Sequence, residues 1–240
     1  MRIQKFLLLN FVIGVLVLCT GCHPNNAAEA HYQDCHYIPA EHQSLIEEFL
    51  RAEEVAYDGI LRIYSNSYYS VALGDTIEEN LGITNSRGEY MAYCMLDGQY
   101  EVAIFVRVRD GEAHANGDWL NFVYNSWNDL LPCALEPEQI FGEEVKVKAV
   151  YWLQSDYNYE GATLCFITDQ GDFFLHQNKN VHEGTYLVPY DVVKQRVEED
   201  QAELAAMGGG LAGSLDIISG EPDMEQYIID LENPPEFPLP

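Results

Sequence analysis

A run of oxygen-bearing side chains at residues 156–161, Asp-Tyr-Asn-Tyr-Glu-Gly, has the composition of a cation-binding loop. Its first, third and fifth positions carry carboxylate or amide oxygens and its sixth is glycine, as in the first half of an EF-hand calcium loop. The twelfth position of such a loop is a bidentate Glu, whereas this chain has Ile167 there. Because Asp, Asn and Gly are also ordinary turn residues, the pattern favours a hairpin loop over a calcium site.

The aromatic residues of the same region suggest a second chemistry, the stacking of rings on sugars. Trp152 lies in a strand-like run, and Tyr157 and Tyr159 alternate with Asp156 and Asn158. Exposed Trp and Tyr rings can stack on a sugar while neighbouring polar groups bind its hydroxyls. These five residues are our candidate ligand-binding set, with packing inside a sheet as the simpler use of the same rings.

Nitrogen, sulfur and oxygen atoms that could bind zinc occur together near the start of the chain, at His31, Asp34, Cys35, His36 and His42. Their spacing does not match the usual patterns of zinc sites, and a polar spacer would give them no rigid support. The sequence therefore favours a polar tether here, and it leaves the question of a bound metal unknown.

Four cysteines follow the first 22 residues: Cys35, Cys94, Cys133 and Cys165. Outside the cytoplasm thiols can oxidise, and four cysteines allow three pairings. Cys94 and Cys165 both fall in the middle of predicted strands, so a Cys94–Cys165 disulfide is the pairing that we predict. Buried thiols are the alternative.

A catalytic cysteine would need a His within hydrogen-bond reach, and the sequence does not place one there. His176 and His182 stand six residues apart across a predicted strand and turn, which is typical of a surface pair. Residues 208–213 satisfy G-x-G-x-x-G as text, but a helical pattern precedes them and an acidic stretch follows, the reverse of a nucleotide-binding unit. The common nucleophile, metalloprotease and P-loop motifs are absent from the sequence. We therefore expect no cofactor.

The first 22 residues differ in kind from the rest of the chain. Arg2 and Lys5 form a basic start, and an apolar run follows from Phe6 to Leu18. A helix of that length covers roughly 20 Å, less than the roughly 30 Å of a bilayer's hydrocarbon core. Residues 1–21 are therefore predicted to be a secretory signal peptide.

The junction Leu18-Cys19-Thr20-Gly21-Cys22 resembles the lipobox of bacterial lipoproteins, with Cys19 at a position that usually holds an aliphatic residue. The resemblance implies a diacylglycerol on Cys22, an acyl anchor of the palmitate type, and localisation at the extracytoplasmic face of the cell membrane. Two acyl chains, at about 0.8 kcal/mol for each buried CH₂, hold a protein stably at a bilayer. A secreted protein with an incidental Cys22 is the alternative.

The chain has 240 residues, of which 48% are hydrophobic, and its 39 acidic and 12 basic residues give a net charge of −27. Without Arg2 and Lys5 the mature chain would carry a net charge of −29. This composition excludes a wholly disordered chain, and the charge argues against nucleic acid as a partner. An envelope protein, a glycan or a cation remains open as a ligand, and solubility is the simplest reason for the charge.

The N-terminal half of the predicted ectodomain begins with a helix. Residues 22–38 are a polar spacer, and Pro39 precedes a helical apolar pattern from Ala40 to Tyr57. Residues 89–109 are predicted to form a hairpin that turns at Asp97-Gly98. Its expected cross-strand pairs are Met95 with Tyr100, Tyr93 with Val102, and Met91 with Ile104.

The C-terminal half is predicted to be a helix followed by a meander. The helix begins at Asp118, carries Trp127 and Leu130 on its apolar stripe, and ends at Pro132. Strands follow at 145–153, 162–168, 172–176 and 184–188, with a turn at 169–171 and a helix from Asp191 that ends before residues 208–210. The order of one helix and four strands is found in cystatin-like folds. Residues 208–240, acidic and containing Pro and Gly, are expected to form a flexible tail in which residues 227–229 could dock.

Together these patterns predict an α+β ectodomain at residues 39–207, with an antiparallel sheet of hairpins and a meander packed against a few amphipathic helices. The favoured function is a membrane-anchored, non-enzymatic binding or interaction module. An envelope hydrolase whose site is assembled from distant residues is one alternative, and a divalent-metal or glycan binder is the other.

Overall fold

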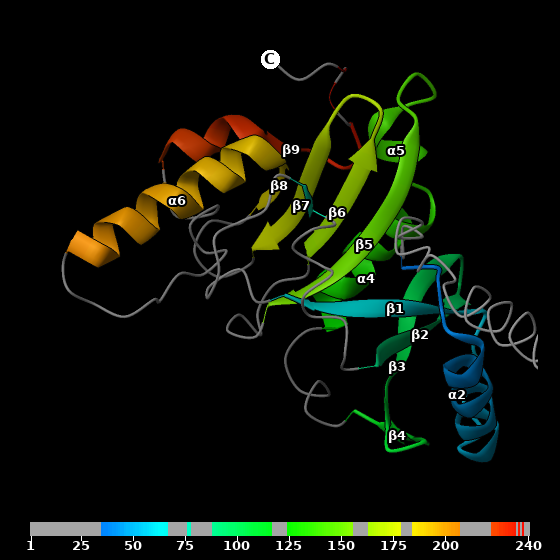
Figure 1. Ribbon diagram of the computed structural model, residues 1–240. Helices are drawn as coiled ribbons and strands as arrows, with labels where there is room; N and C mark the ends of the chain where they lie inside the picture. The colour runs from blue at the N-terminus through cyan, green and yellow to red at the C-terminus, as the bar shows by residue number, and fades with distance from the viewer. Residues whose placement is uncertain are drawn as a thin grey trace, which may run out of the picture. The chain divides into compact units, whose positions relative to one another are not determined.

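Runs rich in β-branched and aromatic residues form a nine-stranded sheet in the computed structural model (Figure 1). The structure describes residues 35–66, 76–77, 88–116, 124–155, 163–178, 184–206, 222–233, 235 and 237. The strands are β1 Gly59–Asn66, β2 Glu89–Leu96, β3 Gln99–Arg109, β4 Glu112–Ala115, β5 Val147–Ser155, β6 Thr163–Thr168, β7 Asp172–Asn178, β8 Gly184–Pro189 and β9 Ile228–Ile229. The helices are α2 Ala40–Ala52, α4 Tyr124–Leu135, α5 Glu138–Phe141, α6 Tyr190–Ala206 and the 3-10 helix η2 Pro222–Tyr227.

The sheet has the order β4-β3-β2-β1-β5-β6-β7-β8-β9. All neighbouring strands are antiparallel except β1 and β5, which are parallel with Ile63 opposite Trp152. In Figure 1, β1 crosses the direction of β6–β8 steeply, as expected for a large twisted sheet. The predicted α+β class is confirmed, and so is the meander β5–β8. A cystatin-like topology is not confirmed, because this meander is one half of a larger mixed sheet.

The hairpin β2–β3 turns at Asp97-Gly98 as predicted, with both residues at positive φ, 51° and 83°. Met95 lies opposite Tyr100 and Tyr93 opposite Val102, again as predicted. The pairing of Met91 with Ile104 is wrong, because a β-bulge beyond Tyr93 shifts the register.

The bulge changes which face each later side chain of β3 occupies. Met91 lies opposite Phe105, and both join the core beneath α4, whereas Ile104 packs on the other face beneath α2. A helix therefore covers each face of the hairpin, whereas alternation of apolar and polar residues predicts that only one face is covered.

Helix α2 ends at Ala52, five residues before the predicted end at Tyr57. Glu54 takes a left-handed conformation, with φ 55°, and the Val55 N–H donates to the Leu50 carbonyl at 2.9 Å. This is a Schellman end, in which Val55 packs back beside Leu50. The usual signal for it, a glycine after the helix, is missing because Glu54 occupies that position.

Helix α4 continues to Leu135 and contains Pro132, so the prediction that Pro132 ends the helix is wrong. An internal proline costs about 3 kcal/mol. The buried side chains around it, Leu130, Leu131, Cys133 and Ala134, account for the tolerance because they pack into the main core. The predicted start at Asp118 lies outside the described residues.

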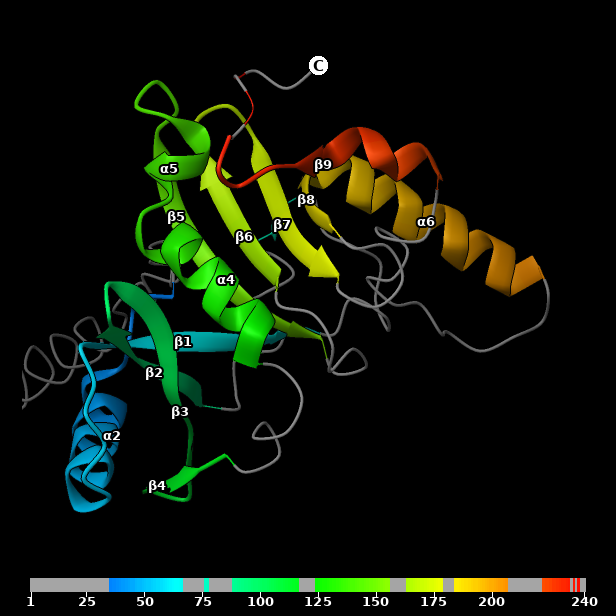
Figure 2. The ribbon, with the colours of Figure 1, turned by 180° about the vertical axis from the view of Figure 1, so that it is seen from behind.

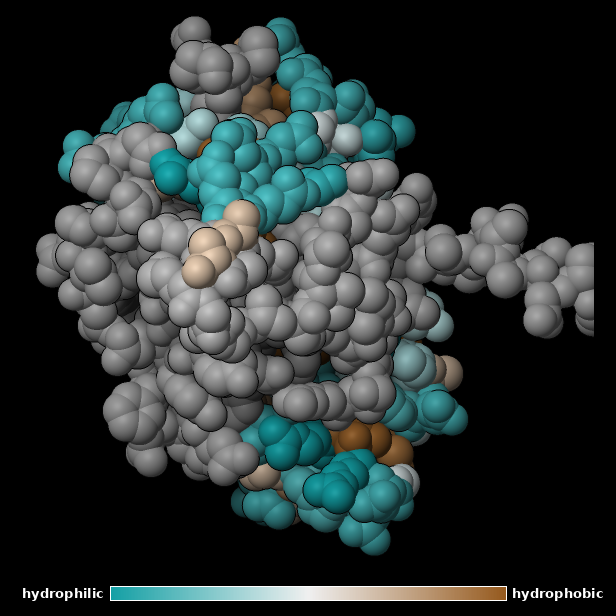
Figure 3. All heavy atoms as spheres, turned by 60° about the vertical axis from the view of Figure 1, so that its left-hand side comes forward, coloured by the Kyte–Doolittle hydropathy of each residue, from teal (hydrophilic) through white to brown (hydrophobic). Residues whose placement is uncertain are grey.

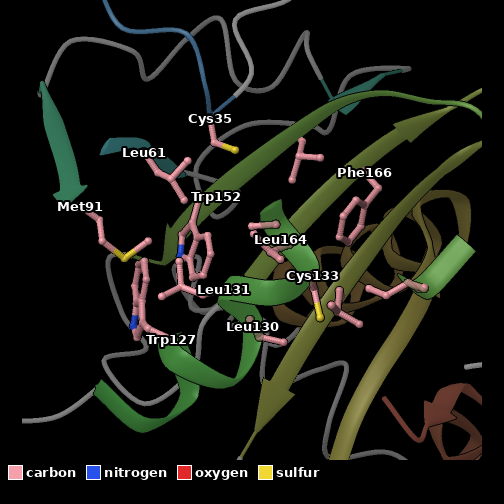
Figure 4. Packing of buried hydrophobic residues seen from close by; sticks show 14 of the residues in the cluster. Cys35, Leu61, Met91, Trp127, Leu130, Leu131, Cys133, Trp152, Leu164 and Phe166 are labelled. Carbon is pink, nitrogen blue, oxygen red and sulfur yellow. The ribbon is translucent and has the colours of Figure 1, made fainter. Parts of the chain in front are cut away.

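Three apolar clusters fill the space between the helices and the sheet. The main core lies between α4 and the sheet face seen in Figure 2, and it contains Trp127 and Trp152, whose stacked rings appear in Figure 4. A second cluster lies under α6 on the opposite face of β5–β8. A third lies between α2 and the hairpin.

Both ends of the folded unit extend beyond the predicted boundaries. The Cys35 N–H donates to the Val150 carbonyl at 2.6 Å, so the end of the predicted spacer packs on the sheet. Ile228 and Ile229 pair with β8, while Met224 is buried beneath α6 and Phe237 contacts Phe141. The described residues 222–233 and Phe237 therefore pack on the domain and do not form a flexible tail; residues 208–210 lie outside the described part.

Candidate functional site

A cavity of about 740 Å³ opens between the end of the β2–β3 hairpin and helices α4 and α5. We call it the hairpin–α4 groove. Its lining comprises Met95, Gly98, Gln99, Tyr100, Glu101, Asn128, Asp129, Pro132, Glu136 and Gln139. Its volume falls within the range of about 300–1,000 Å³ that is usual for ligand clefts.

Two backbone-to-side-chain hydrogen bonds fix the hairpin wall of the groove. The Met95 N–H donates to Oδ2 of Asp58 at 2.6 Å, and the Val102 N–H donates to Oδ1 of Asn128 at 2.9 Å. The second bond ties β3 directly to α4. The groove is consequently built on a strand and a helix that are held together, which gives a binding site a defined shape.

Glu136 is the most constrained carboxylate of the groove. The Tyr100 hydroxyl donates to its Oε1 at 2.9 Å, and Nε2 of Gln139 donates to its Oε2. The Tyr100 bond raises the pKa of the phenol above its usual value, because ionisation would lose the donor and place two negative charges together. The two bonds hold the Glu136 carboxylate in one orientation.

Replacement of Glu136 by Gln should return the pKa of Tyr100 toward its ordinary value near 10, because the neighbouring charge is removed. NMR with ¹³Cζ-labelled tyrosine would follow the Tyr100 resonance across an alkaline titration. Tyr186 on β8, whose pKa is raised chiefly by burial and which does not line the groove, serves as the internal control and should titrate unchanged. An unaltered Tyr100 titration in the variant would show that the bond does not set its pKa.

The lining of the groove contains three acidic side chains, Glu101, Asp129 and Glu136, and no Lys, Arg or His. Next to it, Nε2 of Gln177 on β7 donates to Oδ2 of Asp129 at 3.3 Å. The Gln177 Oε1 atom is buried and has no hydrogen-bond partner among the described residues. The groove and its border therefore offer acceptors and negative charge.

A second cavity, of about 680 Å³, lies between α2 and the β3–β4 turn. Its lining includes both signs of charge, Glu41 and Asp110 with Arg107 and Arg109. Arg107 is paired with the buried Glu89 at 2.8 Å. This cavity is lined by both acidic and basic side chains, whereas the charged side chains of the hairpin–α4 groove are all acidic.

Trp152 does not lie on the surface as the ligand-binding prediction requires. It is 0% exposed and stacks on Trp127, with ring centroids 4.9 Å apart and planes inclined by 13°. The prediction for Trp152 is therefore wrong, because the ring is part of the core. The other four residues of that candidate set, at positions 156–159, lie outside the described residues, as does the lipid-attachment candidate Cys22.

The predicted Cys94–Cys165 disulfide is not present in the structure. Cys94 lies on β2 and Cys165 on β6, with β1 and β5 between them. Three strand spacings amount to roughly 14 Å, twice the roughly 7 Å between Cα atoms that a disulfide tolerates. The strand assignments were right, but the sequence did not show which strands are neighbours.

Iodoacetamide should modify Cys94 at least about tenfold faster than Cys133 in the folded protein, because the thiolate is the reacting form. Cys94 is partly exposed, whereas Cys133 is buried and burial raises its pKa to about 12. Peptide mapping after timed alkylation measures both rates, and unfolding in guanidinium should make them similar. A disulfide-linked peptide that joins Cys94 to Cys165 would contradict the strand order.

The histidines are also placed differently from the prediction. His176 is buried and hydrogen-bonded to the Thr163 hydroxyl at 2.8 Å, so it is not a member of a surface pair; His182 lies outside the described residues. His42 bonds through Nδ1 to the Tyr90 hydroxyl, whose pKa is raised to about 12 chiefly by burial. Within the described ranges, no group of three His, Cys, Asp or Glu side chains is placed to hold a metal ion.

The residues of the hairpin–α4 groove were not identified from the sequence, because they come from segments about 30 residues apart. Met95 and Leu96, 48% and 52% exposed beside a two-residue turn, were the available signal. Figure 3 shows that the coloured part of one molecular face is mainly hydrophilic, with small apolar areas. No helix in the described part of the chain has the length and apolarity of a membrane span. Comparisons with protein-family models, curated proteins and solved structures found no match.

Proposed function

We propose that this protein is a lipid-anchored, extracytoplasmic lipoprotein whose ectodomain is a non-enzymatic binding module. In this proposal Cys22 carries the diacylglycerol, and the hairpin–α4 groove holds the ligand. The observation that carries the binding role is the groove itself, a cleft of about 740 Å³ with one wall from a hairpin and the other from two helices.

The chemistry of the lining supports binding over catalysis. Its ten residues include no Ser, Thr, Cys, His or Lys that could act as a nucleophile or a neighbouring base. Its central carboxylate, Glu136, is held by Tyr100 and Gln139 in a fixed orientation. Fixed acceptors at the wall of a cleft are suited to recognition of a complementary donor.

The two alternative functions have less support from the described residues. A glycan platform at residues 152–159 loses its Trp, because Trp152 is buried against Trp127. A hydrolase with a Ser or Cys nucleophile would need that residue in a cleft, and neither of the two cavities lined by described residues contains one.

The proposal can be tested by photocrosslinking in living cells. A benzophenone amino acid would be placed at Gln99, which is exposed and lines the groove, and at Glu112 on β4 as the matched control. Both positions are exposed on neighbouring strands, so neither substitution should unfold the domain. We expect a saturable adduct in the membrane fraction from position 99 and none from position 112.

Two outcomes would contradict the binding role of the groove. Equal adducts from both positions would show that the crosslinks form with any nearby molecule and not with a ligand of the groove. No adduct from either position would show that the groove is unoccupied in the cell. Thermal melting of each variant must first match the wild type, which excludes misfolding as the cause.

A further inference from the structure

We infer that the ligand of the hairpin–α4 groove is a positively charged peptide segment that also carries an apolar side chain. This inference rests on the proposed binding function and names the class of ligand for the same site. Its two supports are that all charged side chains lining the groove are acidic, and that the exposed Met95 side chain lies at the end of the hairpin and lines the groove.

The charge of the groove favours Lys or Arg side chains. Glu101, Asp129 and Glu136 contribute carboxylates from two opposite walls, and no cationic side chain lines the cavity. The Tyr100 and Gln139 bonds fix the orientation of the Glu136 carboxylate at the wall of the groove. Groups of one sign in a cleft focus the field and attract ligands of the opposite sign.

The exposed Met95 side chain selects a peptide over a small inorganic cation. Met95 is one of the five large hydrophobic side chains that are exposed among the described residues, and it lines the groove, whereas its neighbour Leu96 follows on the opposite face of β2 and is not in the lining. Asp97 and Gly98 fix the turn beside Met95, so little backbone entropy is lost when a ligand covers it. Methionine is well suited to contact with varied apolar side chains.

Metal binding is the competing explanation for an acidic site. In the part of the chain with described coordinates, no group of three potential ligands is arranged around a common point for a metal ion. The carboxylates of the groove come from β3 (Glu101), from α4 (Asp129) and from the connection between α4 and α5 (Glu136). A spread of single acceptors suits the separated donors of a peptide better than the compact shell of a divalent ion.

A fluorescent peptide Lys-Leu-Lys-Leu-Lys is the probe, and its anisotropy would be measured with the full acylated protein in neutral detergent. Lys-Ser-Lys-Ser-Lys tests the apolar contribution, and Glu-Leu-Glu-Leu-Glu tests the sign of the charge. The groove variant is Glu101→Gln/Asp129→Asn/Glu136→Gln. The control variant, Glu48→Gln/Glu112→Gln/Glu198→Gln, changes the net charge equally at exposed acids outside the groove.

We expect the groove variant to weaken binding of Lys-Leu-Lys-Leu-Lys about tenfold, and the control variant to weaken it less than about twofold. Replacing Met95 by Ser should weaken it roughly fivefold and remove the preference over Lys-Ser-Lys-Ser-Lys. Both predictions require melting temperatures close to that of the wild type.

Equal loss in the two charge variants would overturn the inference, because binding would then follow the total charge of the protein. Absence of binding to either lysine peptide would overturn it as well. If the Gln99 crosslink persists in cells under either outcome, the proposed binding function stands and only the ligand class is wrong. If no crosslink forms from position 99 in cells, the proposed binding function itself is rejected.

Discussion

Replacement of Trp127 by Ala should lower the free energy of unfolding by about 4 kcal/mol, the usual size for a large aromatic residue removed from a core. Trp127 is 1% exposed, stacks on Trp152, and makes an edge contact with Phe105 at 5.1 Å between ring centroids. These partners come from β5 and β3, the two halves of the sheet that the parallel β1–β5 pair joins (Figure 4). The loss should therefore affect both halves together.

Urea unfolding followed by circular dichroism measures this loss, with Trp127→Phe as the control. Phe keeps an apolar ring in the same space, so that variant should lose less than half as much stability. A single cooperative transition is expected for both variants, because one core spans the sheet. A Trp127→Ala loss below about 1 kcal/mol would mean that the stacked pair is not in the core.

Removal of two C-terminal contacts should have the next largest effect. Met224 is 1% exposed and packs in the cluster beneath α6, whereas Phe237 packs on Phe141 and Phe173 in the main core. The segment between them passes the edge of β8, where it forms β9. The double variant Met224→Ala/Phe237→Ala should lose about 3.5 kcal/mol, with about 2.5 from the buried Met224 and about 1 from the half-buried Phe237, since the two sites are in separate clusters and their losses should add.

The matched control is Met224→Leu, which conserves volume and should cost less than about 1.5 kcal/mol. Peptide binding in the hairpin–α4 groove should be unchanged in both variants, because neither residue lines it. If the double variant melts like the wild type, residues 222–237 do not stabilise the domain, and the prediction of a flexible tail is restored.

Local patterns predicted much of the secondary structure. The Asp97-Gly98 turn and the alternation around it gave the hairpin, and the meander β5–β8 followed from short apolar runs separated by turn residues. The two exceptions, the end of α2 and the bulge in β3, have local causes that the residue types do not reveal. Glu54 takes the left-handed conformation usually reserved for glycine, and one extra residue in β3 forms a bulge.

Local sequence patterns did not show which distant strands pair with each other. The parallel contact of β1 with β5 joins segments about 90 residues apart, and β1 itself was not predicted. That contact also decides that Cys94 and Cys165 are far apart and that Trp152 is buried. A tryptophan followed by Asp and Asn residues has the same local sequence in a core strand as at a sugar-binding surface, so only the tertiary structure separates the two.

The groove illustrates the same limit for function. Tyr100 on β3 and Glu136, directly after α4, meet across 36 residues of sequence, and neither residue alone indicates a site. Their hydrogen bond, with the nearby Asp129, defines the site. The sequence did indicate an acidic protein and the Asp97-Gly98 turn, but the exposure of Met95 beside that turn is seen only in the structure.

The claim on which the proposed role depends is that the chain works outside the cytoplasm on a lipid anchor. The most direct test is the intact mass of the protein recovered from the membrane fraction of cells that express the full chain. We predict a chain that begins at Cys22 and carries a diacylglycerol with its fatty acids, and a Cys22→Ala variant that lacks this added mass and no longer fractionates with membranes. Recovery of an unmodified chain that still begins at Met1, with the same fractionation for Cys22→Ala, would contradict the claim.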